Sequence, residues 1–304
     1  MEKIKYKLKG HETFCIREGW LAKGIHAVSE DSSVFKKNYG ADALGVGSNM
    51  AKAIRYWLKA FGLTEEKSKT GVQLSEFGKL VLEADPYFEK LLTLWILHIH
   101  LCFHPDVCTS WYLFFKKFPL EEFTKEDVEN QMNRELGEYI GGLEFSKRSL
   151  HDDITVLLQM YAKEGITVTD PEEKKICPFT RLGMIRKQQD SYKRTEADLG
   201  NFGKYIVWYV LCHRLKEKDG INTEKFCAED LEKKKTGINI EEFYTGELGV
   251  KSILGIGRGA YQESLDGLER LGIIDINRTA GLDMIYLKGE QEKAEVLKEI
   301  YKNV

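Results

Sequence analysis

The sequence lacks the segments that would place it in or across a membrane. It contains no apolar run of about eighteen residues, the length that a transmembrane helix needs. The N-terminal stretch MEKIKYKLKGHE lacks the apolar centre of a secretory signal peptide. With 42% hydrophobic and 31% charged residues, the composition is typical of a globular protein in water. We therefore expect the protein to be cytoplasmic, with no membrane partner.

Paired cysteines and proline-rich linkers are also missing. The six cysteines show no C-x-x-C spacing, and in a chain without an export signal we expect them to be reduced and buried. The five prolines do not gather into a linker, and no low-complexity segment separates domains. The order of the predicted elements alone therefore places the domain boundaries, near residues 90 and 200.

The usual signatures of phosphate binding and nuclease chemistry are absent. Gly255 and Gly257 lack the Lys-Ser/Thr of a phosphate-binding loop, and no E-x-K follows a credible strand. The segment HIHLCFHPDVC, from His98 to Cys108, has i,i+4 pairs that can hold a metal, but its apolar helix favours core residues over a metal site. Residues 151–153, HDD, offer carboxylates for a metal-dependent nuclease, with a solvated helix start as the favoured interpretation.

One stretch of twenty residues occurs twice. LGVGSNMAKAIRYWLKAFGL fills residues 44–63, and LGIGRGAYQESLDGLERLGI fills residues 254–273. In both copies two glycines precede an amphipathic helix and another glycine ends it. We expect Ser48 or Asn49 to cap the first helix, because short polar side chains accept hydrogen bonds from the first-turn amides.

Each copy is followed by two short alternating strands. Short helix, turn, helix and hairpin is the order of a winged helix-turn-helix. We therefore predict a mainly α, multidomain fold with short β-hairpins, in which winged helix-turn-helix modules flank a helical middle. The predicted domains are an N-terminal winged-helix domain over residues 1–90, a helical middle with a basic β-hairpin over 91–200, and a C-terminal winged-helix domain over 201–304.

The two copies differ in the charge of their outer faces. The first helix presents Lys52, Arg55 and Lys59, cations that a recognition helix needs for phosphates and base edges. The same face of the second helix carries Gln262, Asp266 and Glu269. DNA would repel that face, so we expect the C-terminal copy to pack against the protein or a partner. The alternative for the first copy is an ordinary solvated face or a protein-interaction module.

A second basic segment lies in the middle region. The stretch ICPFTRLGMIRKQQDSYKRTEADLG is predicted to form a β-hairpin, which can lie along a DNA backbone as a wing. We expect its cations to contact double-stranded DNA together with the first repeat. The predicted DNA-binding residues are Ser48, Asn49, Lys52, Arg55, Lys59, Arg181, Arg186, Lys187, Lys193 and Arg194.

Residues 10–24, GHETFCIREGWLAKG, place a polar cluster directly before an amphipathic helix. If a catalytic centre exists, we expect it to include His11 and Glu12, with Arg17 beside the scissile phosphate. A histidine moves a proton near neutral pH, and a glutamate binds a divalent metal or orients a water. The favoured alternative is structural: Glu12 or Thr13 caps that helix, and His11 bonds a backbone carbonyl.

Several of these stretches together resemble the bacterial family of unknown function numbered four thousand and seven. They are the segment at residues 10–24, the first copy of the repeat, LWILH, DITVLLQMY and CPFTRLGMI, and the resemblance covers nearly the whole chain. The His-Glu-Thr-Phe and Gly-x-Gly-x-Asn-Met motifs within these stretches are fairly specific. The resemblance implies a context in DNA phosphorothioation, where members occur with cysteine desulfurases and PAPS-reductase-like proteins that place sulfur in the DNA backbone.

Two functions from different classes follow. In Ssp-type systems the similar component is described as a DNA-nicking protein, so the resemblance implies a phage-defence nickase with Mg²⁺ or Mn²⁺ as its cofactor. The second is a non-catalytic adaptor that binds DNA and recruits the sulfur-transfer enzymes. The residues by themselves reveal no nuclease centre, so the sequence leaves this choice open.

Overall fold

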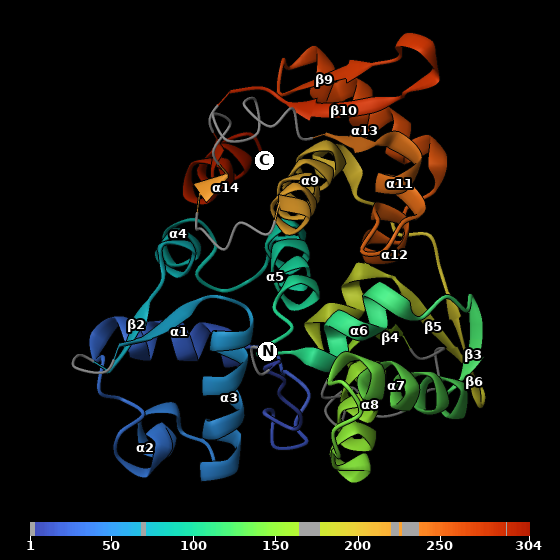
Figure 1. Ribbon diagram of the computed structural model, residues 1–304. Helices are drawn as coiled ribbons and strands as arrows, with labels where there is room; N and C mark the ends of the chain where they lie inside the picture. The colour runs from blue at the N-terminus through green and yellow to red at the C-terminus, as the bar shows by residue number, and fades with distance from the viewer. Residues whose placement is uncertain (1–3, 68–70, 164–176, 220–224, 227–236, 290) are drawn as a thin grey trace. The chain divides into compact units, whose positions relative to one another are not determined.

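The computed structural model describes residues 4–67, 71–163, 177–219, 225–226, 237–289 and 291–304. The chain divides into two compact units, Met1–Thr195 and Glu196–Val304 (Figure 1). Both units are mainly helical with short strands, which confirms the predicted class at the level of helices and hairpins. The finer prediction, three domains with winged helix-turn-helix modules, stays a prediction. None of the described helices is long and apolar enough to span a membrane.

The first unit opens with short helices and a hairpin that share one core. In chain order these elements are α1 (Trp20–Glu30), η1 (Asn38–Gly40), α2 (Ala41–Leu44), α3 (Ser48–Ala60), β1 (Thr64–Lys67), β2 (Gly71–Leu74) and α4 (Glu76–Ala84). Helix α1 lies close to α3 at Gly24, where a Cβ atom would come within 2.7 Å of Leu58 Cδ1. Ser75 caps α4 by accepting a hydrogen bond from Gly78 N–H at 2.9 Å, the role for which a short polar side chain is suited.

The start of α3 differs from the prediction. Ser48 is the first helical residue, and Gly47 occupies the N-cap position in an extended conformation, with no side-chain capping bond. The expected cap by Ser48 or Asn49 is therefore wrong. Gly257 precedes α13 (Arg258–Arg270) in the same way, again without a side-chain cap. In both copies a glycine makes the turn before the helix. In the first copy Ser48 and Asn49, which follow this glycine, are exposed to solvent.

The ends of the two repeated helices are also alike, and they explain why the glycines recur. Leu63 N–H donates to Leu58 O at 2.9 Å, and Gly62 N–H donates to Lys59 O at 2.9 Å, with Gly62 at φ 68. This is a Schellman motif, which needs a residue that tolerates positive φ. In the second copy Gly272, at φ 70, donates to Glu269 O and Ile273 donates to Leu268 O, which is the same pair of bonds. The recurring residues therefore turn the chain and end helices.

The rest of the first unit is a group of helices beside a four-stranded sheet. The helical elements are α5 (Leu91–Phe103), α6 (Thr109–Lys117), α7 (Lys125–Tyr139), α8 (Lys147–Tyr161) and η2 (Pro178–Leu182). The strands are β3 (Glu122–Thr124), β4 (Ala162–Lys163), β5 (Ile185–Gln188) and β6 (Ser191–Arg194). Their order is β3-β6-β5-β4, with only the β4–β5 pair parallel. Helix α5 is apolar on nearly every side and is buried, as predicted.

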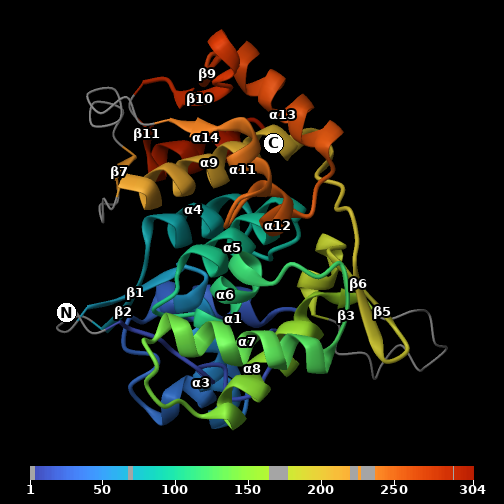
Figure 2. The ribbon, with the colours of Figure 1, turned by 45° about the vertical axis from the view of Figure 1, so that its right-hand side comes forward.

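The second unit has a helical core and two small sheets. Its helical elements are η3 (Gly200–Phe202), α9 (Gly203–Asp219), α11 (Ile240–Thr245), α12 (Val250–Leu254), α13, η4 (Thr279–Gly281) and α14 (Lys293–Lys302). Its strands are β7 (Lys225–Phe226), β8 (Ile238–Asn239), β9 (Ile274–Asn277), β10 (Met284–Leu287) and β11 (Gln291–Glu292). Helix α9 contacts both α13 and α14 (Figure 2). Strands β9 and β10 form the predicted hairpin, and η4 is its turn.

Candidate nucleic-acid interface

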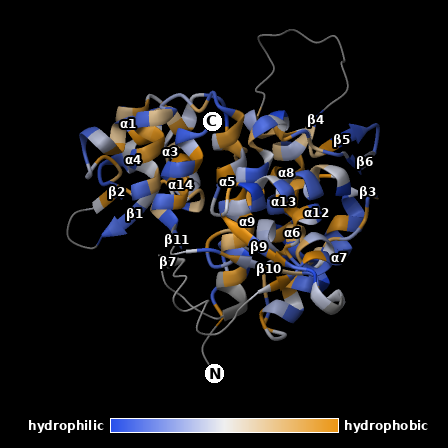
Figure 3. Cartoon of the chain, turned by 90° about the horizontal axis from the view of Figure 1, so that it is seen from above, coloured by the Kyte–Doolittle hydropathy of each residue, from blue (hydrophilic) through white to orange (hydrophobic). Residues whose placement is uncertain are grey.

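The exposed face of α3 carries two of its three predicted cations in contact with one carboxylate. Arg55 Nε and Nη2 donate to Glu66 Oε1 at 3.2 and 2.9 Å, and Lys59 Nζ donates to Glu66 Oε2 at 3.1 Å. Glu66 lies on β1, a mostly hydrophilic strand (Figure 3). The three side chains remain 40%, 45% and 39% exposed, so this is a surface ion pair that water screens and that DNA can reach.

Glu66 reduces the net positive charge on the exposed face of α3. Partial burial raises the pKa of Glu66. The hydrogen bond and charge of Lys59, together with the charge of Arg55, lower it by more, so the pKa of Glu66 lies below its ordinary value. Glu66 is therefore ionised at neutral pH, and three cations less one carboxylate leave a net charge of +2. No sequence signal marks this residue, because only the antiparallel pairing of β1 with β2 fixes where β1 lies against α3.

The N-terminal half of α3 presents a polar surface with an aromatic ring. Lys52 Nζ lies 4.6 Å from the centre of the Tyr39 ring and 3.4 Å from Asn49 Oδ1. Ser48 and Asn49 are exposed, and Tyr39 is 48% exposed. Tyr39 belongs to η1, outside the repeat, and no sequence pattern points to it. The structure thus adds a tyrosine to the predicted group of Ser48, Asn49 and Lys52.

The second copy of the repeat turns carboxylates outward. Glu269 stands where the first copy has Lys59; its Oε1 accepts from Ile276 N–H at 3.3 Å, and its Oε2 lies 3.6 Å from Arg278 Nη1. Gln262 stands where the first copy has Lys52, and it donates to Asp266 at 2.8 Å. The charge difference between the copies that the sequence predicts is therefore present on the folded helices.

A row of charged side chains crosses the four-stranded sheet. Glu122, Lys193, Arg186 and Lys163 stand at successive paired positions on β3, β6, β5 and β4. Residues opposite one another in a sheet point to the same face, so three cations and one carboxylate lie side by side. Lys193 forms an ion pair with Glu122. Lys163 was not predicted, because its strand is only two residues long and comes from a different part of the chain.

The other predicted cations of this segment lie elsewhere. Arg194 is half-buried, with its guanidinium 5.0 Å from the Phe114 ring centre and a bond from Nη2 to Phe118 O at 3.1 Å. Burial lowers the pKa of Arg194 to about 10. Arg181 lies in η2 and donates to Glu89 O at 2.7 Å. Lys187 is half-buried on β5. Arg194 thus holds β6 against α6, while Arg186 and Lys193 face solvent.

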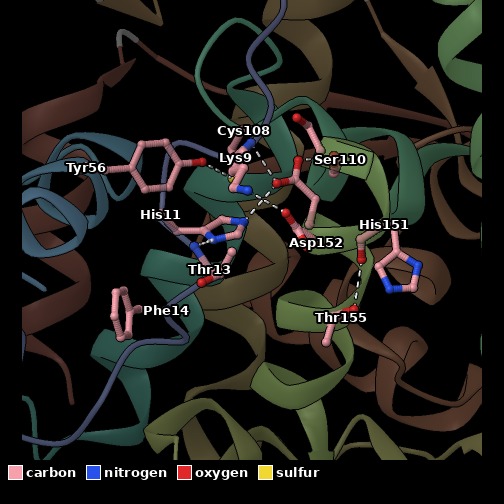
Figure 4. A network of polar contacts seen from close by, with 12 residues as sticks. Lys9, His11, Thr13, Phe14, Tyr56, Cys108, Ser110, His151, Asp152 and Thr155 are labelled. Atoms are coloured by element: carbon pink, nitrogen blue, oxygen red, sulfur yellow. Dashed lines mark hydrogen bonds and ion pairs between the residues drawn. The ribbon is translucent and has the colours of Figure 1, made fainter. Parts of the chain in front are cut away.

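The N-terminal segment is fixed by a buried polar network in which Lys9, His11 and Ser110, labelled in Figure 4, contact Asp153 of α8. Asp153 Oδ1 accepts from Lys9 N–H and contacts His11 Nε2, both at 2.8 Å, and Asp153 Oδ2 accepts from Ser110 Oγ at 2.6 Å. His11 is fully buried and Asp153 is 2% exposed. The expected solvated acidic pair at residues 152 and 153 is therefore wrong for Asp153. Its partners lie up to 144 positions away, so spacing in the sequence does not reveal them.

The hydrogen bonds of His11 identify its tautomer. Thr13 N–H donates to His11 Nδ1 at 3.1 Å, so Nδ1 carries no proton and Nε2 donates to Asp153. The ring stacks on Trp57, with centroids 5.7 Å apart and planes 12° apart. Ser110 bonds the carboxylate and not the imidazole, so these residues do not have the geometry of a serine-histidine-aspartate triad.

The contacts expected in the structural alternative are wrong: the His11 ring contacts the Asp153 carboxylate and Thr13 N–H, not a backbone carbonyl. Helix α1 begins at Trp20 with Gly19 at its N-cap, so neither Glu12 nor Thr13 caps it. Both residues instead occupy a tight turn with positive φ, 50 and 67. Arg17 precedes the helix, and its guanidinium lies 5.1 Å from the Trp20 ring centre. His11, Glu12 and Arg17 therefore do not converge on one exposed point.

The histidine and cysteine cluster of α5 belongs to the core. His98 Nδ1 contacts Tyr161 Oη at 2.7 Å, and His100 Nδ1 contacts Phe61 O at 2.5 Å. Within the described part of the chain, no group of three or more His, Cys, Asp or Glu side chains is placed to hold a metal ion. Four of the five described cysteines are buried, as predicted, whereas Cys15 is half-buried; all five are free, and Cys227 lies outside the described residues.

Comparison with known proteins gives a family model and a fold. The model of the family described as protein of unknown function (DUF4007) matches residues 8–301. Two crystal structures of SspB, one of them bound to a magnesium ion, match with a TM-score of 0.79. They are 22% identical, and the match covers 98% of this chain and 88% of theirs, so the likeness is one of fold. No curated protein matches the sequence.

Proposed function

The chain belongs to the DUF4007 family, and from that membership we propose that it is the DNA-binding component of a bacterial DNA phosphorothioation system. The exposed basic face of α3 is the observation that carries the proposal. The fold likeness to SspB supports the same assignment. The partners that this context implies are double-stranded DNA and the sulfur-transfer enzymes, a cysteine desulfurase and a PAPS-reductase-like protein.

In this proposal, residues 20–84 act as a winged helix-turn-helix. Helices α1, α2 and α3 precede the β1–β2 hairpin and α4, which is the element order of such a module. Helix α3 buries Ile54, Trp57 and Leu58 on one side and leaves its cations on the other. That division lets a recognition helix enter the major groove without losing its core contacts.

The row on the four-stranded sheet is proposed as a second contact with the DNA backbone. Like charges opposite one another in a sheet repel, and Arg186 stands between Lys193 and Lys163. Among the residues that the structure describes, Glu122 pairs with Lys193 and so compensates one of these cations. A phosphate group would relieve the remaining repulsion, and because it carries no base information it would position the DNA without reading its sequence.

The described residues favour an adaptor over a nickase. Asp153 uses its oxygens on Lys9, His11 and Ser110, and Asp152 lies 2.7 Å from Lys9 Nζ. Because both carboxylates are already occupied by these partners, they do not fit a magnesium centre, and no metal-dependent step is assigned to them. We propose that the protein binds DNA and brings the sulfur-transfer enzymes to it. The magnesium-bound SspB structure favours the second candidate, a nickase with Mg²⁺ or Mn²⁺.

The test of DNA binding neutralises α3. Replacing Lys52, Arg55 and Lys59 with Gln should weaken duplex binding at least tenfold at low salt. It should also reduce the slope of log affinity against log salt by about 2 to 3, because a protein that makes fewer phosphate contacts releases fewer counterions when it binds. Fluorescence anisotropy with a labelled duplex over a salt series measures both quantities. The matched control replaces Arg258 and Arg270 of α13 with Gln, and equal losses from the two sets would contradict the proposed division of labour.

A plasmid assay separates the adaptor from the nickase. Supercoiled plasmid incubated with the protein and Mg²⁺ or Mn²⁺ should stay supercoiled if the protein only binds. Conversion to the open circle, lost when α3 is neutralised, would establish nicking and contradict the adaptor.

A further inference from the structure

Tyr39 is held in a backbone conformation that tyrosine rarely adopts. Asn38, Tyr39 and Gly40 have φ values of 45, 54 and 83, so three successive residues are left-handed. Asparagine and glycine tolerate this region, but a tyrosine Cβ crowds the following carbonyl oxygen. The turn therefore costs free energy at Tyr39 in particular.

Packing does not compensate for this cost at Tyr39. Two other large apolar residues with positive φ, Phe88 and Leu248, are only 7% and 0% exposed, so burial of their side chains offsets their strain. The Tyr39 side chain is 48% exposed. Strain that the core does not offset is typical of a residue that meets a ligand.

The surroundings of Tyr39 indicate what that ligand is. Lys52 lies against the ring, and Asn49, Ser48, Lys36 and Lys37 expose polar or cationic groups on α3 and just before η1. An aromatic ring among cations is the arrangement that stacks a nucleobase while the adjoining phosphates are neutralised. A base within an intact duplex already has both faces covered by its neighbours. The ring can therefore stack only on a base that has lost its pair or its neighbour.

We propose that Tyr39 stacks on an unpaired nucleobase of the DNA that α3 holds. The inference rests on the proposed function, and it assigns Tyr39 the role of sensing a bulge, gap or strand end beside the recognition helix. Such a site would direct the protein to DNA that is already open, where a modifying enzyme can reach the backbone.

The experiment compares a fully paired duplex with the same duplex carrying one bulged 2-aminopurine. The wild-type chain should bind the bulged duplex about tenfold more tightly and should quench the 2-aminopurine fluorescence. Tyr39→Ala should lose the preference and the quenching but keep its affinity for the paired duplex, whereas Tyr39→Phe should keep both. Tyr39→Asn, which relieves the strain, should keep or raise the melting temperature and still lose the preference. The control is Tyr87→Ala, because Tyr87 is 68% exposed and lies outside η1 and α3.

The outcomes separate this inference from the proposed function. A wild-type chain that binds both duplexes equally, or a Tyr39→Ala chain that keeps the preference, would overturn the stacking role and leave duplex binding standing. A chain that binds neither duplex would overturn both. Equal losses from Tyr39→Ala and Tyr87→Ala would show a general effect of exposed tyrosines and would also contradict the inference.

Discussion

At position 11, a fully buried histidine ties the N-terminal segment to α8. Its Nε2 meets Asp153 at 2.8 Å, its Nδ1 accepts from Thr13 N–H, and its ring stacks on Trp57. Because both nitrogens are engaged and the side chain has no exposed surface, the imidazole cannot contact a phosphate in this arrangement. We interpret the His-Glu-Thr-Phe motif as a structural clasp.

Replacing this histidine should therefore act on stability. His11→Ala removes the donor to a buried carboxylate and the stacking on Trp57, so it should lower the free energy of unfolding by about 3 kcal/mol. Urea denaturation followed by tryptophan fluorescence measures the change. Glu12→Gln, next to it and only partly buried, should change stability by less than about 0.5 kcal/mol. Should His11→Ala keep its stability while a plasmid-nicking activity disappears, the catalytic interpretation would be correct instead.

At the scale of elements, the β1–β2 hairpin completes the candidate winged module and also places a carboxylate beside the cations of α3. Glu66 on β1 contacts Arg55 and Lys59, so a phosphate that approaches α3 meets a carboxylate already in place. Glu65 on the same strand points to the opposite face and pairs only weakly with Lys67, at 3.9 Å. The strand thus provides a test residue and its own control.

Removing the Glu66 charge should strengthen DNA binding. Glu66→Gln frees Arg55 and Lys59 and removes a repulsive charge, so affinity for a duplex should rise about fivefold at low salt, with the gain fading as salt screens it. Anisotropy titrations at low and high salt measure this. Glu65→Gln should give a smaller gain, because its side chain points away from α3. An unchanged affinity for Glu66→Gln would mean that α3 does not face the DNA.

At the scale of the whole molecule, the candidate DNA contacts gather in one unit. Helix α3 and the row on the four-stranded sheet both belong to Met1–Thr195, while the repeat in Glu196–Val304 turns carboxylates outward. The two copies of the repeat thus share the same helix ends but carry outer helix faces of different charge. We therefore propose a different role for the second unit, contact with a protein partner.

The first unit alone should therefore bind DNA. A fragment of residues 1–195 should keep duplex affinity within about threefold of the whole chain, since it holds every cation proposed to contact phosphate. Circular dichroism confirms its folding, and anisotropy gives its affinity. Comparable binding by residues 196–304, or loss of binding by a folded 1–195 fragment, would contradict this assignment.

The sequence by itself determined the local features of this protein. Helical periodicity, Ser75 and Thr124 as caps, and glycines at positive φ are encoded within a few residues, so α3, α7, the hairpins and the repeated helix ends could be predicted. The charge of each helix face followed as well, because it depends only on 3.6-residue spacing. The N-cap of α3 at Gly47 was missed, since glycine and serine both suit that position.

Only the tertiary structure decided which of these residues meet. Four features join segments that pair only in the folded chain: the clasp of His11 with Asp153, the ion pairs of Arg55 and Lys59 with Glu66, the bond of Arg194 to Phe118 O, and the row that includes Lys163. The physical reason is range. Propensity and capping act over one helical turn, whereas burial and ion pairing depend on distances that only the packed chain sets.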